Sequence, residues 1–513
     1  MTSHSLPHST GAAISSGRGR PTWIAALVIA AAIVAAYVTS FRGALVFDDL
    51  PGIANNPTIR DLSHPELLLV AIGPQGGTLS GRPVPNFTLA LNYAISGDEL
   101  WSYHAANLLI HVAAALTLFG IVRRTLLRPL LAEHFGSNAG AIALGVALLW
   151  GVHPLQTESV TYLVQRVESL MGLFYLLTLY CFLRAIDSPE ARRGWYVRAF
   201  FACLFGMGCK EVMVTAPVVV ALYDRTFVAG SWREALRTRW KFYGALLSTW
   251  IALGGLVVAS GGRGGTAGYE VGVNAWSYLL TQCEVIIDYV KLSFWPFFLA
   301  FDHNVPLALG ISQVWPQALV LCALLGTTVY FLIRRPVAGF LCATFFLILA
   351  PTSSIVPVAD AMVEHRMYLP LAVIVTFVVV GMHRQSGRLA PLIWSGLAVV
   401  LGATTAIRNL DYRSPLTLWE DTVKKIPGSP RAHNNLGAYL LSDGRLEAAR
   451  EHFSTALRLK PNYASAHYNF GQLLEKTGQV EEAIQSYETA TRLNPKLVDA
   501  HVNSARLLDR VGR

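Results

Sequence analysis

Two adjacent carboxylates, Asp48 and Asp49, stand in the first polar segment after an apolar N-terminal stretch, in GALVFDDLPGIANNPTI, residues 43–59. A carboxylate can act as a general base toward a hydroxyl group, and a second carboxylate beside it can bind an acceptor or a divalent ion. An acid followed by a proline in the first helical turn is also typical of a helix N-cap, here Asp49 before a short helix beginning at Leu50-Pro51. We predict that Asp48 is the base, and that Asp49 binds the acceptor or an ion, or caps that helix.

Three cationic side chains stand where they could bind a phosphate group: Arg82, Lys210 and Arg366. Arg82 lies on the same polar segment as the acids, and a snorkelling surface arginine is the structural alternative. Lys210 and Glu211 interrupt an apolar stretch, where charges often mark a site, and a mutual ion pair is the alternative. Arg366 precedes an apolar run, where an anchor at the membrane interface would also place an arginine. We predict that all three contact a phosphate, with Arg366 as the preferred clamp.

Further polar residues near the ends of apolar runs are predicted to support this site: His104, His153, Glu158, Arg166, Glu211, Glu364, His365 and Tyr368. His104 and His111 are seven residues apart on one helix face, a spacing that more often indicates a polar contact between helices. His153 and Glu158 could bind a metal, but two ligands without a third are a weak metal signal. A divalent cation, Mg²⁺ or Mn²⁺, therefore stays an open alternative as a cofactor.

The composition indicates which elements must position these residues. Of the 513 residues, 53% are hydrophobic and 14% are charged, whereas soluble domains carry about 25% charged residues. A run of roughly 20 apolar residues crosses a bilayer as a helix. We therefore predict an all-α fold with a polytopic bundle of about eleven spans. The runs lie near residues 23–37, 103–122, 139–153, 164–183, 196–209, 212–224, 242–260, 315–333, 337–352, 367–382 and 390–407.

Basic residues predict which loops are cytoplasmic, because arginine and lysine follow every even-numbered span. This scheme places an arm of residues 1–20 in the cytoplasm and a first loop, residues 41–102, on the outer side of a membrane domain of residues 21–408. The segment near 276–300 is apolar but charged, and we predict that it is re-entrant or interfacial on the outer side. The basic residues are spread over separate short loops, which favours the lipid bilayer as partner and argues against nucleic acid.

Residues 409–513 are predicted to form tetratricopeptide repeats on the outer side. Pro427, Pro461 and Pro495 recur at 461 − 427 = 34 and 495 − 461 = 34, which is the period of this repeat. The stretches RAHNNLG, SAHYNFG and DAHVNSA share that spacing. Such helix pairs stack into an α-solenoid with a concave groove, which could bind an acceptor protein or peptide.

Several stretches, taken in order, resemble the transmembrane and tetratricopeptide-repeat-containing (TMTC) family: VFDDLPGIANNPTI, GRPVPNFTLALNYAISG, WSYHAANLLIHV, GVHPLQTESVTYLVQRVESL, CKEVMVTAPVVVALYD and EHRMYLP. The resemblance covers roughly residues 20–513, although the repeat array is short. It implies a GT-C fold, protein O-mannosyltransferase activity and an isoprenoid-phosphate sugar donor, which in a bacterium would be a polyprenyl-phosphate sugar. It also implies that Asp48-Asp49 is the acidic pair of GT-C enzymes.

The chemistry of such a transfer can be argued from the residues as well. A base must activate the acceptor hydroxyl, and cations must stabilise the departing phosphate. We predict transfer of a sugar, mannose by resemblance, from a polyprenyl-phosphate donor to a Ser or Thr hydroxyl of a protein. A non-enzymatic membrane scaffold and a lipid or sugar transporter are the alternatives. The predicted location is the bacterial inner membrane with periplasmic repeats, or the ER membrane with lumenal repeats in a eukaryote.

Overall fold

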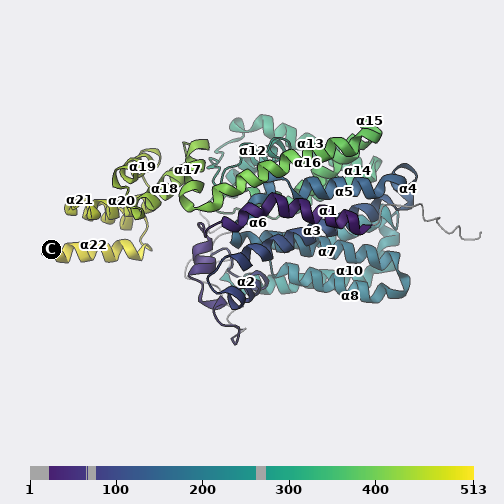
Figure 1. Cartoon of the computed structure of the whole chain (residues 1–513), viewed down its shortest axis with the longest axis horizontal. Coiled ribbons are helices and arrows are strands. Elements are labelled where there is room, and N and C mark those ends of the chain that lie inside the picture. The colour runs from purple at the N-terminus through teal and green to yellow at the C-terminus, as the bar shows by residue number, and fades with distance from the viewer. Residues whose placement is uncertain (1–21, 65, 67–76, 262–272, 513) are drawn as a thin grey trace, which may run out of the picture.

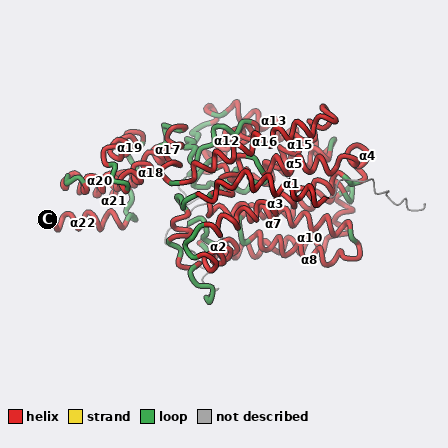
Figure 2. The backbone as a smooth tube through the Cα atoms, viewed as in Figure 1, coloured by secondary structure: helices red, strands yellow, loops and turns green. Residues whose placement is uncertain are grey.

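The computed structural model describes residues 22–64, 66, 77–261 and 273–512. The predicted cytoplasmic arm, residues 1–20, lies outside the described residues. Figure 1 shows a bundle of helices lying alongside one another and a smaller group of C-terminal helices at one end of it. The regular elements of the described chain are helices, joined by loops and turns (Figure 2).

The bundle is built from the apolar runs of the sequence. α3 packs against α5 and α7, and α1 packs against α16. Proline stands in the first turn of α13, α14, α15 and α16, where its missing N–H has no helical partner to lose. The helices of this part are α1 (Thr22–Tyr37), α2 (Pro83–Ser96), α3 (Trp101–Leu126), α4 (Pro129–Phe135), α5 (Ala139–Gly151), α6 (Thr157–Thr161), α7 (Arg166–Asp187), α8 (Arg192–Met207), α9 (Ala216–Phe227), α10 (Trp232–Ala259), α12 (Ala275–Phe294), α13 (Trp315–Arg334), α14 (Pro336–Leu349), α15 (Pro370–Ser386) and α16 (Ala390–Arg408).

The number of membrane spans differs from the prediction. Within the described residues, 6 helical runs are long and apolar enough to cross a bilayer, or up to 7 if the bent pair Pro129–Gly151 and Pro154–Thr161 is one span. The prediction of about eleven spans is therefore wrong in number. Each predicted run is helical, but α8, α9 and α14 have 16, 12 and 14 residues, fewer than the roughly 20 that a span needs. The last two predicted runs lie together in one run, Pro370–Arg413.

The segment predicted to be re-entrant or interfacial forms one continuous helix, α12, which is absent from the set of long apolar runs. Its polar residues face the loop before α15. Tyr278 Oη donates to the Thr352 carbonyl at 2.7 Å, and Gln282 Nε2 donates to the Ala361 carbonyl at 3.0 Å. The segment therefore supports a loop that also carries polar residues of the site described below.

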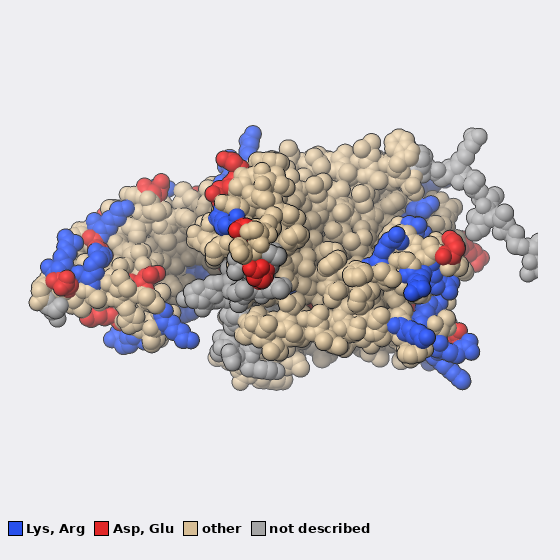
Figure 3. All heavy atoms as spheres, turned by 90° about the horizontal axis from the view of Figure 1, so that it is seen from below, with Lys and Arg blue, Asp and Glu red and all other residues tan. Residues whose placement is uncertain are grey.

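Basic side chains gather at the end of the bundle that lies away from the C-terminal helices, as Figure 3 shows. Arg123 and Arg124 lie in the last turn of α3, and Arg184 lies in the last turn of α7. Over the C-terminal helices, basic and acidic residues are mixed (Figure 3). Clustered arginine and lysine at short loops is typical of the cytoplasmic side of a membrane protein.

The C-terminal helices have the predicted repeat. Corresponding helices begin at Pro430, Ala464 and Val498, and both differences are 34 (464 − 430 and 498 − 464). Within the first repeat Gly437 faces Phe453, and a Cβ there would lie 2.8 Å from the ring. A small residue opposite an aromatic ring lets the two helices of the repeat pack closely. The helices are α17 (Pro415–Lys425), α18 (Pro430–Ser442), α19 (Leu446–Leu459), α20 (Ala464–Lys476), α21 (Val480–Leu493) and α22 (Val498–Arg510).

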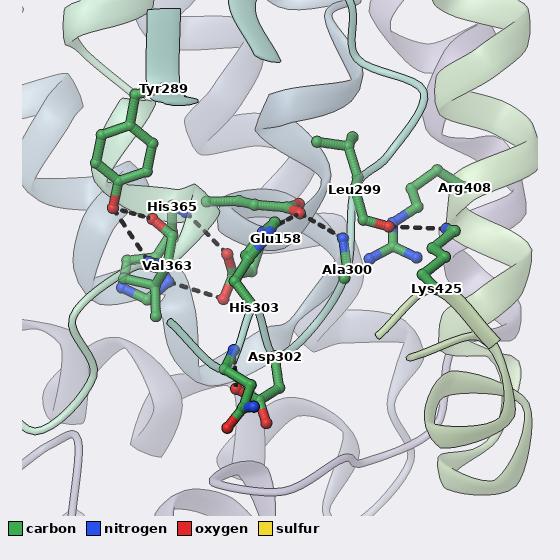
Figure 4. Close-up of polar contacts among 12 residues, drawn as sticks. Glu158, Tyr289, Leu299, Ala300, Asp302, His303, Val363, His365, Arg408 and Lys425 are labelled. Carbon is green, nitrogen blue, oxygen red and sulfur yellow. Dashed lines mark hydrogen bonds and ion pairs between the residues drawn. The ribbon is translucent and has the colours of Figure 1, made fainter. Parts of the chain in front are cut away.

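α17 seats the repeats on the bundle. Trp419 is 1% exposed, and its ring centroid lies 6.0 Å from that of Phe47 and 5.3 Å from that of Phe301. Such edge-to-face aromatic contacts add to the free energy gained by burial. Lys425 Nζ donates to the Leu299 carbonyl at 2.7 Å (Figure 4). The first loop and the segment after α12 therefore both contact the start of the repeats.

Candidate active site

Asp48 is presented by a turn that three other elements hold in place. Phe47 has a φ of 43°, a left-handed conformation that is uncommon for a bulky residue, and its ring packs on Trp419. The Asp48 backbone N–H donates to the Tyr162 hydroxyl at 2.8 Å, and Thr78 Oγ1 donates to Asp48 Oδ2 at 2.7 Å. Burial raises the pKa of the Asp48 carboxyl, and the Thr78 hydrogen bond opposes that rise. A fixed carboxylate of raised pKa suits a general base.

Asp49, in contrast to Asp48, does not line a cavity, and its side chain is fully buried in the protein interior. Its Oδ1 accepts from the Val164 N–H at 2.7 Å, and its Oδ2 accepts from the Val46 N–H at 3.1 Å. The prediction that Asp49 caps the helix at Leu50 is wrong, because both oxygens are turned to these amides and no side-chain cap bond forms. Burial raises the pKa of Asp49 to about 8, against the effect of those two hydrogen bonds. The side chain ties the first loop to the turn before α7.

Asp48 faces a cavity of about 40 Å³ at the end of the bundle where the repeats are seated; we call it the Asp48 cavity. Four carboxylates, one guanidinium and one imidazole reach its wall. Of the acids and cations predicted for catalysis and phosphate binding, Asp48 lines it, whereas Asp49, Arg82, Lys210 and Arg366 do not. The lining residues are Phe47, Asp48, Glu158, Tyr162, Gln165, Phe301, Asp302, Asp360, Val363, His365, Trp419 and Arg431.

Two predicted supporting residues meet at this cavity. Glu158 accepts from the backbone N–H of His365 at 2.8 Å and from its Nδ1 at 2.9 Å (Figure 4). Glu364 turns to other partners and accepts from the Ala300 N–H at 2.7 Å and from His303 Nε2 at 3.0 Å. The paired Glu158 and His365 can therefore present an imidazole beside Asp48, and Glu364 holds the wall behind them.

Arg82 is connected to Asp48 through one residue. Its Nη1 donates at 2.5 Å to the carbonyl of Thr78, the residue whose hydroxyl binds Asp48. Its Nη2 lies 3.4 Å from Glu211 Oε2. Its Nε is buried and has no hydrogen-bond partner among the described residues. Arg82 is therefore a half-buried cation with an unused donor near the proposed base.

Lys210 forms its ion pair with Glu168, on α7, rather than with the adjacent Glu211. The alternative of a mutual Lys210–Glu211 pair is therefore wrong. Adjacent residues in an extended backbone point apart, and Lys210 has extended φ and ψ of −156° and 149°. Glu211 reaches Arg82 instead.

Arg366 and Arg166 are both buried and serve the chain itself. Arg366 Nη1 donates to the Ala361 carbonyl at 2.9 Å and Nη2 to the Asp360 carbonyl at 2.5 Å, so that it holds the loop carrying Asp360. Arg166 Nε donates to Asn107 Oδ1 at 2.6 Å, and its Nη1 donates to Asn92 Oδ1 at 2.5 Å. Each guanidinium donates to neutral oxygens of the chain, and neither residue lines the Asp48 cavity.

The predicted histidines make structural contacts. His104 Nε2 donates to the Gly43 carbonyl at 3.2 Å, and His153 Nε2 donates to the Ser293 carbonyl at 3.1 Å. His111 Nε2 lies 2.8 Å from the Gly151 carbonyl, and its Nδ1 lies 2.9 Å from the Tyr368 hydroxyl. For His111 the interpretation as a polar contact between helices is confirmed, and Tyr368 is its partner.

No group of three or more His, Cys, Asp or Glu side chains in the part of the chain that the structure describes could hold a metal ion. His153 and Glu158, the pair considered as metal ligands, bind separate backbone groups. Four acids line the Asp48 cavity, but Asp302 is neutralised by Arg431, and Glu158 is bound to His365.

Sequence reasoning missed Asp302, Asp360 and Arg431. Arg431, at the start of α18, binds both acids across the junction between the repeats and the bundle. One signal was available, because Arg431 corresponds to Ser465 and Asp499 in the next two repeats. A cation at a position where the next two repeats carry a serine and an acid indicates a role outside the solenoid.

The fold and this site define a class: a multi-pass membrane protein with a polar cavity beside a tetratricopeptide domain. Residues 80–254 match the family model of dolichyl-phosphate-mannose-protein mannosyltransferases, and residues 440–478 and 464–497 match tetratricopeptide-repeat models. The chain thus combines a domain of that mannosyltransferase family with repeats, and it is a distant homologue of the TMTC protein O-mannosyl-transferases over most of its length.

Three relatives illustrate how low the sequence identity is. A protein O-mannosyl-transferase of Caenorhabditis elegans is 24% identical over 471 residues, 87% of this chain and 64% of that protein. Tmtc3 of Drosophila melanogaster is 26% identical, over 85% of this chain and 55% of that protein. TMTC4 of Homo sapiens is 25% identical, over 84% and 66%. The chain spans less than two thirds of the length of each.

One solved structure, ArnT from Cupriavidus metallidurans bound to undecaprenyl phosphate, aligns over 92% of this chain and 79% of its own. The sequence identity is 16% and the TM-score is 0.37. A TM-score at this level does not establish a shared fold.

Proposed function

We propose that the protein is a GT-C glycosyltransferase that moves a sugar, mannose, from a polyprenyl-phosphate donor to a Ser or Thr hydroxyl of an acceptor protein. The observation that carries the proposal is the position of Asp48, a carboxylate of raised pKa on the wall of a polar cavity, whose turn is held by contacts with Tyr162, Thr78 and Trp419. The match of residues 80–254 to the mannosyltransferase family supports the reaction class.

In this mechanism Asp48 accepts the proton of the acceptor hydroxyl as its oxygen attacks C1 of the sugar. The bond between C1 and the phosphate oxygen breaks, and the lipid phosphate leaves as an anion, so no acid is needed. We assign the stabilisation of that anion to Arg82, because its Nε is unpaired among the described residues and Thr78 connects it to Asp48. Lys210 and Arg366 are proposed to shape the site through Glu168 and the Asp360 loop.

The reaction is proposed to take place on the outer side of the membrane, the periplasmic side in a bacterium. The support is the charge distribution, because basic residues gather at the end of the bundle opposite to the repeats and the Asp48 cavity (Figure 3). A lipid-linked sugar is the form of donor that reaches that side without a soluble nucleotide.

The test is transfer of mannose from polyprenyl-phosphate mannose to Ser- and Thr-containing peptides by the purified protein. Asp48→Asn keeps the size of the side chain but cannot take the proton, and we expect the rate to fall by about 10²–10⁴-fold. Asp49→Asn places an NH₂ group against a backbone N–H, so we expect a lower melting temperature as well as a lower rate. Asp98→Asn, at an exposed acid paired with Arg60, is the matched control and should leave the rate unchanged.

A folded Asp48→Asn protein that transfers mannose at the wild-type rate would refute this mechanism. The acceptor itself is identified by comparing the glycoproteomes of the wild-type and deletion strains, which also gives the mass added.

A further inference from the structure

A second and larger cavity, of about 270 Å³, lies next to the Asp48 cavity; we call it the junction cavity. The two cavities share three wall residues, Asp302, Asp360 and Arg431. The junction cavity is therefore continuous in its wall with the proposed site of transfer. Its lining residues are Val273, Asp302, Asn304, Val305, Leu307, Val358, Ala359, Asp360, Ala361, Met362, Pro430, Arg431, Lys460 and Tyr463.

Both parts of the molecule build this cavity. The segment after α12 and the loop before α15 supply one wall, and the first repeat supplies the other. The two walls are fastened together, since Ser429 Oγ donates to Asp302 Oδ2 at 2.7 Å while also capping α18. Asn304 Nδ2 donates to the Gly428 carbonyl at 3.0 Å.

Arg431 stands at the shared wall with its donors occupied by carboxylates. Its Nε and Nη2 donate to Asp302 at 3.1 and 2.6 Å, and its Nη1 donates to Asp360 at 2.6 Å. Burial would raise the pKa of Asp302, but the hydrogen bonds and charge of Arg431, together with hydrogen bonds from Ser429 and the Asn304 N–H, outweigh it and lower that pKa. This bidentate geometry holds both acids in one arrangement.

The residues that line the junction cavity indicate which kind of ligand it can bind. A lipid phosphate needs a wall with excess positive charge, whereas the two cations of this wall, Arg431 and Lys460, are matched by two acids, both of them bound to Arg431. Much of the remaining wall is apolar or small, as at Leu307 and Ala359. A neutral polypeptide segment with small or apolar side chains fits such a wall better than an anion does.

We propose that the junction cavity binds the acceptor polypeptide beside the residue to be glycosylated, and that Arg431 is a positioning residue that holds the wall between this segment and Asp48. The inference rests on the proposed glycosyltransferase function and names its acceptor site. The tetratricopeptide domain then contributes to the acceptor site itself, in addition to any groove along its own helices. The departure of Arg431 from Ser465 and Asp499 at equivalent repeat positions agrees with this role.

A photocrosslinking experiment tests the site independently of catalysis. The full-length protein in nanodiscs is illuminated with a benzophenone-bearing synthetic peptide rich in Ser, Thr, Ala and Val, and the labelled residues are mapped by mass spectrometry. We expect labels within 302–307, 358–362 and 430–463. Ala359→Trp fills the cavity from an exposed position and should lower labelling by at least about tenfold, equivalent to 1.4 kcal/mol.

Ala191→Trp, at an exposed alanine beyond the basic end of α7, is the matched control and should label like wild type. Asp48→Asn should also label like wild type, because it leaves the junction cavity intact. Labelling that maps elsewhere, or that Ala359→Trp does not reduce, overturns the inference. Normal labelling together with full activity of Asp48→Asn would refute the catalytic proposal and leave this binding site standing.

Steady-state kinetics test Arg431. Arg431→Gln should raise KM for the peptide by about tenfold with little change in KM for the lipid donor, and Arg431→Lys should recover part of that loss because it keeps the charge without the fork. Arg506→Gln removes an arginine that pairs with Glu475 at the far end of the array, and it should change neither KM. An Arg431→Gln protein with unchanged peptide KM, or with both KM values raised alongside a lowered melting temperature, overturns the positioning role.

Discussion

Asp48 and Asp49 have the same chemistry and different neighbours. The oxygens of Asp49 accept from two backbone amides in the protein interior, whereas Asp48 lines a cavity and accepts from the Thr78 hydroxyl. Burial raises the pKa of both carboxyls, but Asp48 can exchange its proton with an acceptor in the cavity. One acid of the pair therefore positions the loop and the other is available for proton transfer.

The pH dependence of transfer follows from Asp48. A base must be deprotonated, so kcat/KM should fall as the pH drops through the raised pKa, and this acid limb should lie above the ordinary value of about 3.9. The charges of Asp360, Arg431 and His365 also act on Asp48. Thr78→Val removes the hydrogen bond that opposes the rise and should move the acid limb to still higher pH, while Thr78→Ser should leave it in place. An acid limb that does not move in Thr78→Val would contradict the assignment of Asp48.

At the scale of elements, the contact between the first loop and α17 decides the geometry of the site. Trp419 packs against Phe47, whose strained backbone immediately precedes Asp48. Strain of this kind persists where the surrounding structure over-determines it. A helix of the repeat region thus helps to hold the turn that carries the proposed base.

Trp419→Ala should show this coupling. Removing a fully buried tryptophan costs about 3–5 kcal/mol, so we expect a lower melting temperature, faster proteolysis between α16 and α18, and a large loss of transfer. Trp240→Ala, at a tryptophan that is 63% exposed near the basic end, is the control and should change little. Wild-type stability and activity in Trp419→Ala would show that the repeats are not required to hold the Asp48 turn.

At the scale of the whole molecule, the two ends of the bundle differ in charge, and only one of them, in the part of the chain that the structure describes, contacts the tetratricopeptide repeats. Arginine and lysine crowd one end (Figure 3), whereas the residues that line the Asp48 cavity and the junction cavity lie at the other end, with the repeats. Because positive loops stay in the cytoplasm, we expect the first loop and the repeats to share the outer compartment.

Thiol labelling of intact cells checks this arrangement. Cys322 and Cys342, which are not fully buried, are first replaced by serine. Cysteines placed at Ser63, in the first loop, and at Ser442, in α18, should then both react with an impermeant reagent. A cysteine at Ala191 should react after the membrane is permeabilised and not before. Reaction at one of the first two positions and not at the other would reject the shared compartment.

The sequence by itself determined the features that depend on neighbouring residues. Every predicted apolar run is helical, and the helices of the repeats recur at the 34-residue spacing, because helix formation and the repeat pattern are written in local periodicity. The number of spans was overestimated, since apolarity marks a helix but the length that a helix reaches depends on where the chain turns. The acidic pair was also singled out from the sequence. The sequence did not show that Asp49 would bind two backbone amides while Asp48 lines a cavity.

Tertiary structure alone decided which charges meet. Lys210 pairs with Glu168 rather than with its neighbour Glu211, and Arg431 reaches Asp302, 129 positions earlier in the chain. Arg366, predicted to bind a phosphate, donates to the backbone of the loop that carries Asp360. The free energy of an ion pair falls as the distance between the two charges grows. Packing alone brings these segments together, and no local sequence pattern records the distance between them.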